Sequence, residues 1–137
     1  MNLLGRTKIV PSIVPVSSNT ALTEVAIDCT GFDRCCHIIS TGAMATGATL
    51  DYKVQEDSAA AMNVAAADIT GAVLTQIAAA TGASKVYAID VPVNPAKPYQ
   101  KAVGAAATDV VLVSAVAVLY EGSGTFPKTA ATEAVIV

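Results

Sequence analysis

Alternation of hydrophobic and polar residues is clearest in the stretch TLDYKVQED, residues 49–57. Leu50, Tyr52 and Val54 fall on one side of this stretch, and most of its polar residues fall on the other. A β-strand places successive side chains on opposite faces, so a period of two indicates a strand with one buried face. The stretch therefore predicts a half-buried strand that ends at the charged pair Glu56-Asp57.

Short apolar runs separated by turn-forming residues continue along most of the chain. Gly, Pro, Asn and Asp between such runs are typical of a sandwich or barrel of antiparallel strands. Residues 110–120 are apolar at both alternating positions, which indicates a central strand covered on both faces. The runs predict strands at residues 23–28, 35–40, 50–55, 85–91, 99–105, 109–120 and 133–137.

The alanine-rich segment at residues 58–83 is the least regular part of the pattern. Alanine favours helix, but Ile69-Thr70-Gly71 interrupts the run, and the stretch AVLTQIA suits a strand equally well. We expect a loop with one helical turn, followed by strands near residues 67–70 and 73–78.

Residues 1–20 differ from the rest because Pro11 and Pro15 stand among β-branched residues. Proline lacks a backbone donor and fixes φ, so within sheets it is confined mainly to edge strands. The segment is therefore an extended arm or an edge strand, held either by its own domain or by another subunit. We predict an all-β fold: a single antiparallel, jelly-roll-like β-sandwich domain at residues 21–137, preceded by an extended N-terminal arm at residues 1–20.

The composition indicates a core of small side chains and a surface that is partly covered. The chain has 137 residues, the length of one domain. Hydrophobic residues make up 53% of it but aromatic residues only 4%, so its apolar content is mostly Ala and Val. Small side chains bury little area each, and association with a partner would add burial and stability. Charged residues are sparse, at 14%, which also favours a partner-covered surface.

Charge and hydropathy argue against two classes of partner. The net charge is −3, and the eight Lys and Arg residues form no cluster of the kind that binds nucleic acid. The longest apolar run, Val110–Tyr120, is about half as long as a membrane-spanning helix. The start MNLLGRTKIV lacks the apolar core of a signal peptide. We expect a soluble protein that is made in a cytoplasm and binds neither nucleic acid nor a membrane.

Residues that could carry catalysis or bind a metal are few. The single histidine, His37, has no nucleophile-elbow serine to act on, and no phosphate-binding loop or dinucleotide fingerprint occurs. Cys35-Cys36-His37 has the composition of a metal cluster, but a strand points Cys35 and Cys36 to opposite faces. With Cys29, these thiols are expected to be buried small hydrophobes. We predict no enzyme, no cofactor and no metal site.

Two binding sites remain as weaker interpretations. Asp51, Glu56 and Asp57 could together bind calcium, although a solvated strand end is the favoured interpretation of the acidic pair. Phe32 and Phe126 lie in loops and could anchor a sugar ring, but four Tyr and two Phe give a glycan-binding surface little support.

Three stretches form a set of motifs, namely TGATLDYKVQED (46–57), ADITGAVLTQI (67–77) and KPYQKAVGAA (97–106). Together they resemble a family of small proteins of tailed bacteriophages and prophages, typically encoded beside the major capsid protein. The family pattern has an alternating strand ending in Gln with acidic or Ser residues, then Asp-Val-Thr-Gly-Ala, then Arg-Tyr-Leu-Arg, then a valine-rich strand. The matching residues are Leu50–Gln55, Asp68–Ala72, Lys97–Lys101 and Val110–Leu119, with departures at Pro98 and Gln100.

The resemblance implies a head decoration (cement) protein, a structural virion component that binds the outer surface of the phage capsid and stabilises its lattice. It implies the major capsid protein and further copies of this chain, as a homotrimer, as partners. The protein would lie on the outer capsid surface of the virion and be made in the host bacterial cytoplasm. A head–tail or tail structural protein of the virion, or a glycan-binding β-sandwich module on the virion surface, are the alternatives. The residues expected at the capsid or subunit interface lie in the arm: Arg6, Lys8, Ile9, Val10, Ile13 and Val14.

Overall fold

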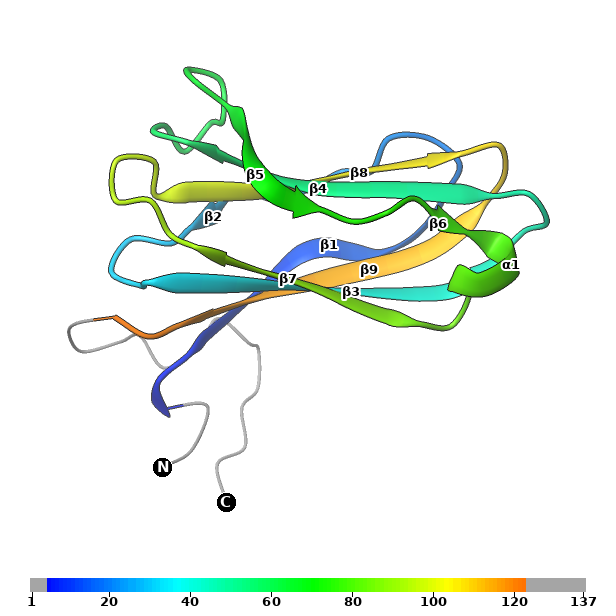
Figure 1. Ribbon diagram of the computed structural model, residues 1–137, viewed down its shortest axis with the longest axis horizontal. Coiled ribbons are helices and arrows are strands. Elements are labelled where there is room, and N and C mark those ends of the chain that lie inside the picture. Colours follow the sequence, from blue (N-terminus) through cyan, green and yellow to red (C-terminus); the bar gives the residue numbers. More distant parts are fainter. Residues whose placement is uncertain (1–4, 123–137) are drawn as a thin grey trace.

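In the computed structural model, which describes residues 5–122, two antiparallel β-sheets lie face to face (Figure 1). Sheet A has the strand order β1-β9-β3-β7, and sheet B has the order β2-β8-β4-β5 with the short β6 beside β4. The strands of sheet A are β1 (Lys8–Ser18), β9 (Val111–Tyr120), β3 (Arg34–Met44) and β7 (Val86–Pro92). Those of sheet B are β2 (Ile27–Asp28), β8 (Tyr99–Ala107), β4 (Thr49–Asp57), β5 (Ala67–Val73) and β6 (Ile77–Ala78), and one helical turn, α1 (Ala79–Gly82), follows β6.

The strands pair in the order of a jelly roll. β1 pairs with β9, β2 with β8, β3 with β7 and β4 with β5, so early strands pair with late strands in nested order. Pairing of β9 with β3, and of β8 with β4, joins these pairs into the two sheets. Two packed sheets connected in this way form the jelly-roll architecture. The expected all-β sandwich is therefore confirmed.

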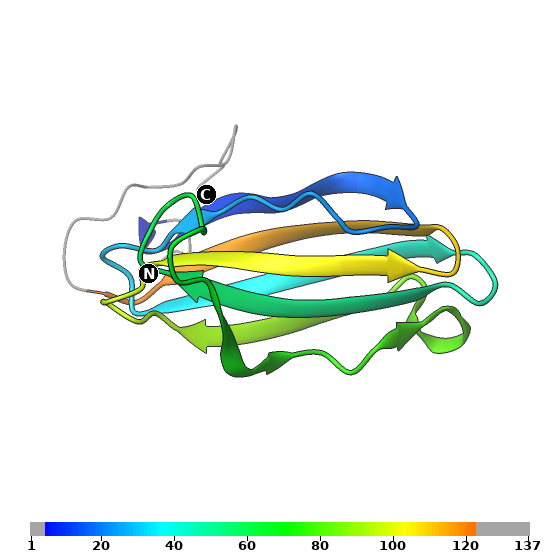
Figure 2. The ribbon, with the colours of Figure 1, turned by 90° about the horizontal axis from the view of Figure 1, so that it is seen from above.

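The core lies between the two sheets and follows the alternation of their strands. Val113 and Leu119 of β9 point inward and are buried, and Leu50 and Tyr52 of β4 are buried from the opposite sheet. Seen from above, the strands of the two layers run in nearly the same direction (Figure 2), which is the aligned packing of β-sandwiches. The half-buried strand expected at residues 49–57 is β4.

Most of the expected N-terminal arm forms β1, the edge strand of sheet A. β1 pairs with β9, and its register shifts between Pro11 and Ile13 and again between Ile13 and Val16. An edge strand tolerates proline because one of its sides carries no ladder, and the shifts mark irregular pairing around the two prolines. Ile13 is only 1% exposed and belongs to the core. Of the two interpretations of this segment, packing on its own domain is therefore the one observed.

Several boundaries differ from those expected, for local reasons. β3 continues to Met44, beyond the strand expected at residues 35–40, and a short turn in which Gly47 has a φ of 84° leads into β4. In the alanine-rich segment, α1 follows the strands instead of preceding them, and β5 passes through Gly71 at a φ of 82°. Glycine adopts such a positive φ without the penalty that other residues carry. Of the expected strand at residues 23–28 only β2 is paired, and the strand expected at residues 133–137 lies outside the described residues.

Candidate functional site

β9 is one of the two inner strands of sheet A, as expected, but its two faces have different surroundings. Its inward residues are buried under sheet B, whereas Leu112 is 43% exposed and Val116 is 40% exposed on the opposite side. The expectation that residues 110–120 are covered on both faces is therefore wrong for the described chain. Sheet B covers one side of sheet A, and no described element covers the other.

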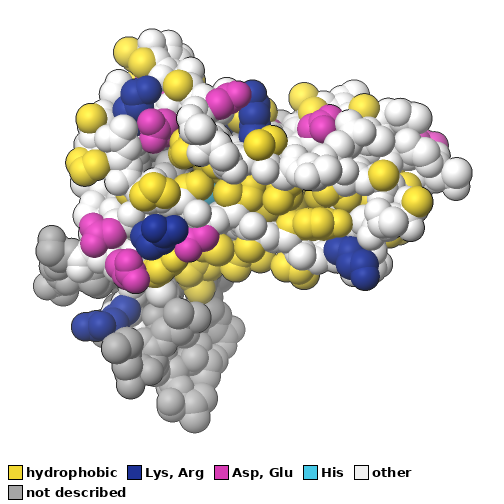
Figure 3. All heavy atoms as spheres, viewed as in Figure 1, with side chains coloured by type: hydrophobic (Ala, Val, Ile, Leu, Met, Phe, Trp, Pro, Cys, Tyr) yellow, Lys and Arg dark blue, Asp and Glu magenta, His cyan; other side chains and the backbone are white. Residues whose placement is uncertain are grey.

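The uncovered side of sheet A, which we call the outer A face, is apolar across neighbouring strands. Ile38 of β3 lies opposite Val116 of β9 on one side and Ala88 of β7 on the other. Two residues along the strands, on the same face, Cys36 lies opposite Val118. Figure 3 views the sandwich from its β7 edge, where hydrophobic side chains form a band between the two layers. The register places these larger apolar residues on the outer A face: Ile9, Cys36, Ile38, Leu112, Val116 and Val118.

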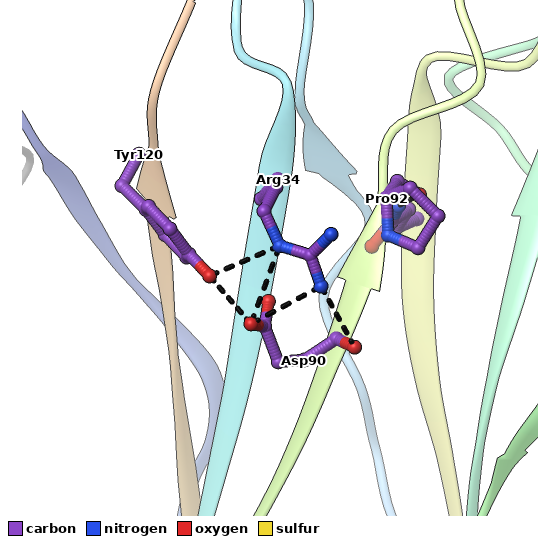
Figure 4. A network of polar contacts seen from close by, with 5 residues as sticks. Arg34, Asp90, Pro92 and Tyr120 are labelled. Atoms are coloured by element: carbon purple, nitrogen blue, oxygen red, sulfur yellow. Dashed lines mark hydrogen bonds and ion pairs between the residues drawn. The ribbon is translucent and has the colours of Figure 1, made fainter.

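A polar network closes one end of the outer A face (Figure 4). Arg34 at the start of β3 forms an ion pair with Asp90 of β7 at 3.2 Å, and its Nε donates to the Tyr120 hydroxyl of β9 at 3.1 Å. The Tyr120 hydroxyl in turn donates to the Asp90 carboxylate. This last bond raises the pKa of Tyr120, because ionisation would remove the donated proton beside a carboxylate. Among the charged residues of the described strands of sheet A, Arg34 and Asp90 lie on the outer A face, while Lys8 lies opposite inward-facing Leu119.

An open depression lies at the other end of the same face. It has a volume of about 420 Å³, and Leu112 shares its lining with the hydroxyl side chains of Ser17, Ser40 and Ser114. Gly42 also lines the depression, and its lack of a side chain keeps the space beside Leu112 free. A Cβ at this position would lie 3.1 Å from Leu112 Cβ. Small residues therefore give this end of the face a hollow that a side chain of a partner could enter.

The outer face of sheet B is mixed, because charged and amide side chains lie there beside the apolar Val73 and Val103. The Lys53 Nζ atom lies 2.8 Å from a carboxylate oxygen of Asp68, and the Gln55 amide donates to the same carboxylate at 2.7 Å. The Lys53 bond, followed by the Gln55 bond, lowers the pKa of Asp68 below its usual value. The Gln76 amide donates to Asp51 at 3.1 Å. These exposed polar groups hydrogen-bond with one another and with water, so they need no protein partner to cover them. A large exposed apolar patch has no such contacts and is typical of an interaction surface.

The six arm residues proposed for an interface do not lie together on one face. Val10 and Ile13 pack in or against the core, so they are not available to a partner in the folded chain. Val14 is 63% exposed on β1, and Ile9 lies opposite Val118 on the outer A face. Arg6 is exposed just before β1, and Lys8 is half-buried at its start.

Sequence reasoning missed Ile38, Leu112 and Val116 as surface residues. The signal for Leu112 and Val116 was present in the apolar run at residues 110–120, but the run was interpreted as burial on both faces. Ile38 lies in the strand expected at residues 35–40. An apolar outward face and a fully buried strand have the same sequence pattern.

The cysteine and histidine residues lie in the core, apart from Cys36. Cys29, Cys35 and Cys36 are free thiols, and Cys35 and His37 are buried. A hydrogen bond with the neighbouring Cys29 thiol, together with burial, raises the pKa of Cys35, so its nucleophilic thiolate form is disfavoured. No group of three His, Cys, Asp or Glu side chains in residues 5–122 is placed to hold a metal ion.

The acidic residues considered for calcium are used separately by the fold. Asp57 is buried and accepts backbone hydrogen bonds from Ala59, Val64 and Ala65 at 3.3, 3.1 and 3.0 Å. The interpretation of Asp57 as part of a solvated strand end is therefore wrong. The loop after β4 folds back over the carboxylate and replaces water as its hydrogen-bond donor.

The structure places one of the two proposed sugar-binding aromatic residues in the core. Phe32 is buried, so its ring face cannot carry a sugar, and Phe126 lies outside the described residues. In the part of the chain that the structure describes, no helix has the length and hydropathy to cross a membrane.

Comparison with known proteins assigns no family. No protein-family model matches the sequence, and no curated protein matches it. One solved structure, described as "Bacillus endospore appendages form a novel family of disulfide-linked pili", is 13% identical and has a TM-score of 0.41. The alignment covers 90% of this chain and 96% of that one. At this level of similarity it indicates neither a family nor a function.

Proposed function

We propose that this chain is a structural virion protein that binds the outer surface of a phage capsid and stabilises the capsid lattice. The observation that carries the proposal is the contrast between the two outer faces of the sandwich. The outer A face is apolar around Val116 and Ile38, whereas the face of sheet B carries the Lys53–Asp68 ion pair. A jelly roll with one such apolar face is suited to permanent attachment to a larger assembly.

The resemblance of three sequence stretches to phage decoration proteins supplies the identity of the assembly. The partners in the proposal are accordingly the major capsid protein and further copies of this chain, arranged on the capsid as a homotrimer. An acidic chain with a net charge of −3 suits an outer capsid surface better than one that faces packaged DNA. Within the described residues, the burial of His37, Cys29 and Cys35 supports packing rather than catalysis.

Substitutions on the outer A face test the proposal more sharply than removal of the N-terminal segment. Deleting residues 2–16 would remove most of β1, including the core residue Ile13, and would unfold the domain. Val116→Asp and Leu112→Asp change exposed positions and keep the core intact. Val73→Asp is a matched control, because Val73 is 62% exposed on β5 of the other sheet.

The experiment is co-expression with the major capsid protein encoded beside this chain, followed by purification of the particles. We expect the unmodified chain and Val73→Asp to sediment with particles and Val116→Asp and Leu112→Asp to remain in the free fraction. Circular dichroism and thermal unfolding of each purified variant establish that it is folded. Equal occupancy of particles by all four proteins would disprove the role of this face, and no association of the unmodified chain with capsids would disprove the function.

A further inference from the structure

The outer A face also bears on the state of the protein before it meets a capsid. We propose that in the free protein the outer A face of one chain packs against the outer A face of a second copy, forming a closed pair with two-fold symmetry. The inference rests on the proposed function, in which the capsid covers the outer A face. It states that a second copy of the chain covers this face when no capsid is present. The pair opens when the capsid takes the place of the second copy.

The size of the face suits a pair. Sheet A has four strands, and spacings of about 4.8 Å between strands and roughly 3.3 Å per residue give an outline of about 600 Å² for strands of about ten residues. A standard interface takes roughly 800 Å² from each partner. Two such faces therefore bury nearly as much area as a stable pair requires, and the depression at Leu112 adds contact for an entering side chain.

The charge of the face also favours a second copy. A symmetric interface repeats every charge of one copy on the other, so an excess of either sign on the face would repel its own copy. Arg34 and Asp90 carry opposite charges and already pair at 3.2 Å, which leaves the described face neutral. The net charge of −3 belongs to the rest of the chain, including Asp51 and Asp68 on sheet B.

The twist of the sheet allows a second copy to pack on the face. All sheets of L-amino acids share one direction of twist, and two sheets pack face to face about 10 Å apart with strands within about 30° of each other. Ser40 lies opposite Ser114 across the β3–β9 ladder, and Gly42 follows on β3, so small residues surround the exposed Leu112 at that end. A second copy presents a sheet of the same twist, apolar content and width.

Sedimentation of the purified full-length chain across a dilution series is the first test. We expect a reversible pair for the unmodified protein and an increase of about tenfold or more in its dissociation constant for Val116→Asp, since a buried charge replaces a central contact. Val73→Asp should keep the dissociation constant of the unmodified chain. A protein that sediments as a monomer or a trimer at every concentration, or a pair unaffected by Val116→Asp, would overturn the inference.

Cysteine cross-linking gives a second measurement that does not depend on a disruptive substitution. Cys36 lies on the outer A face and is partly exposed, whereas Cys29 and Cys35 are buried. A short bismaleimide should join two unmodified chains through Cys36, and Cys36→Ser should abolish the cross-link while leaving the pair intact in sedimentation. Cross-linking that persists in Cys36→Ser, or a pair that gives no Cys36 cross-link, counts against this face.

The two proposals fail separately. A chain that occupies capsids but never pairs in solution would overturn the pairing and leave the proposed function standing. A chain that pairs through Cys36 and Val116 but never occupies capsids would overturn the proposed function. The pairing would then describe a self-assembling protein of another kind.

Discussion

His37 and Gln100 join the two sheets across the core, with His37 Nε2 3.0 Å from the side-chain oxygen of Gln100. His37 lies on β3 of sheet A and Gln100 on β8 of sheet B, and both are fully buried. Because an amide oxygen only accepts, the imidazole donates from Nε2. The Gln100 amide donates to the Pro92 carbonyl at 3.3 Å. This chain of bonds therefore links the two sheets through buried polar side chains.

Replacing Gln100 by Leu should destabilise the fold by about 1–3 kcal/mol, because it leaves the buried His37 N–H without an acceptor at nearly constant side-chain volume. Urea unfolding of the purified variant measures the change. Gln76→Leu is the control, since Gln76 is exposed, and its loss should change stability by less than about 0.5 kcal/mol. Equal effects of the two substitutions would show that the His37–Gln100 bond contributes nothing specific.

The free energy of unfolding should fall as the pH is lowered from 7.5 to 5.5. Below the ordinary pKa of histidine the fall should reach up to about 1.4 kcal/mol per pH unit. Burial lowers the pKa of His37, and this outweighs the opposing effects of the Gln100 bond and of Asp90. The folded state therefore keeps His37 neutral, while the unfolded chain takes up a proton below a pH of about 6.5. The unfolded state binds more protons in this range, so acid favours it.

Urea midpoints at several pH values measure this dependence. A His37→Gln variant should lose most of the slope between pH 7.5 and 5.5, whatever its absolute stability. An unchanged slope in that variant would assign the dependence to other groups.

Asp57→Asn should loosen the loop after β4, because the carboxylate that collects the backbone N–H groups of Ala59, Val64 and Ala65 is lost. Burial raises the pKa of Asp57, but the backbone hydrogen bonds lower it by more. The net effect is a pKa below the usual value of an aspartate. The carboxylate therefore stabilises the fold at neutral pH, and its contribution is lost as the pH falls through its lowered pKa.

Hydrogen exchange at neutral pH is the appropriate measurement for this loop. The amides of Val64 and Ala65 should exchange faster in Asp57→Asn and be unchanged in Asp51→Asn, where the carboxylate is exposed and accepts from the Gln76 side chain. Unchanged protection of both amides in Asp57→Asn would mean that the carboxylate does not hold the loop.

Gly104→Ala should destabilise the protein by about 1–3 kcal/mol through overpacking. A Cβ at Gly104 on β8 would lie 2.7 Å from Leu22 Cδ1, so the Leu22 side chain must move. In a Leu22→Ala background the same substitution should cost less, because the obstructing atom is gone. Chemical denaturation of the two single variants and the double variant gives the coupling energy, and strict additivity would contradict the contact.

The alternation of apolar and polar residues was sufficient to place most strands, because the face to which a side chain points depends only on its position along the strand. It identified β4 from TLDYKVQED and β9 from the apolar run at residues 110–120. The prolines likewise marked β1 as an extended arm or edge strand. Glycines at positive φ and the helical turn after β6 shifted boundaries by a few residues, since these depend on turn geometry.

By itself, then, the sequence determined an all-β sandwich with a core of small side chains. Tertiary structure alone decided that β1 pairs with β9 from the other end of the chain, that the loop after β4 buries Asp57, and that one face of β9 stays uncovered. An apolar residue such as Val116 has the same local pattern whether a second layer covers it or not. Which of these occurs depends on contacts between residues distant in sequence, and this is why the outer A face could be recognised only once the two sheets were in place.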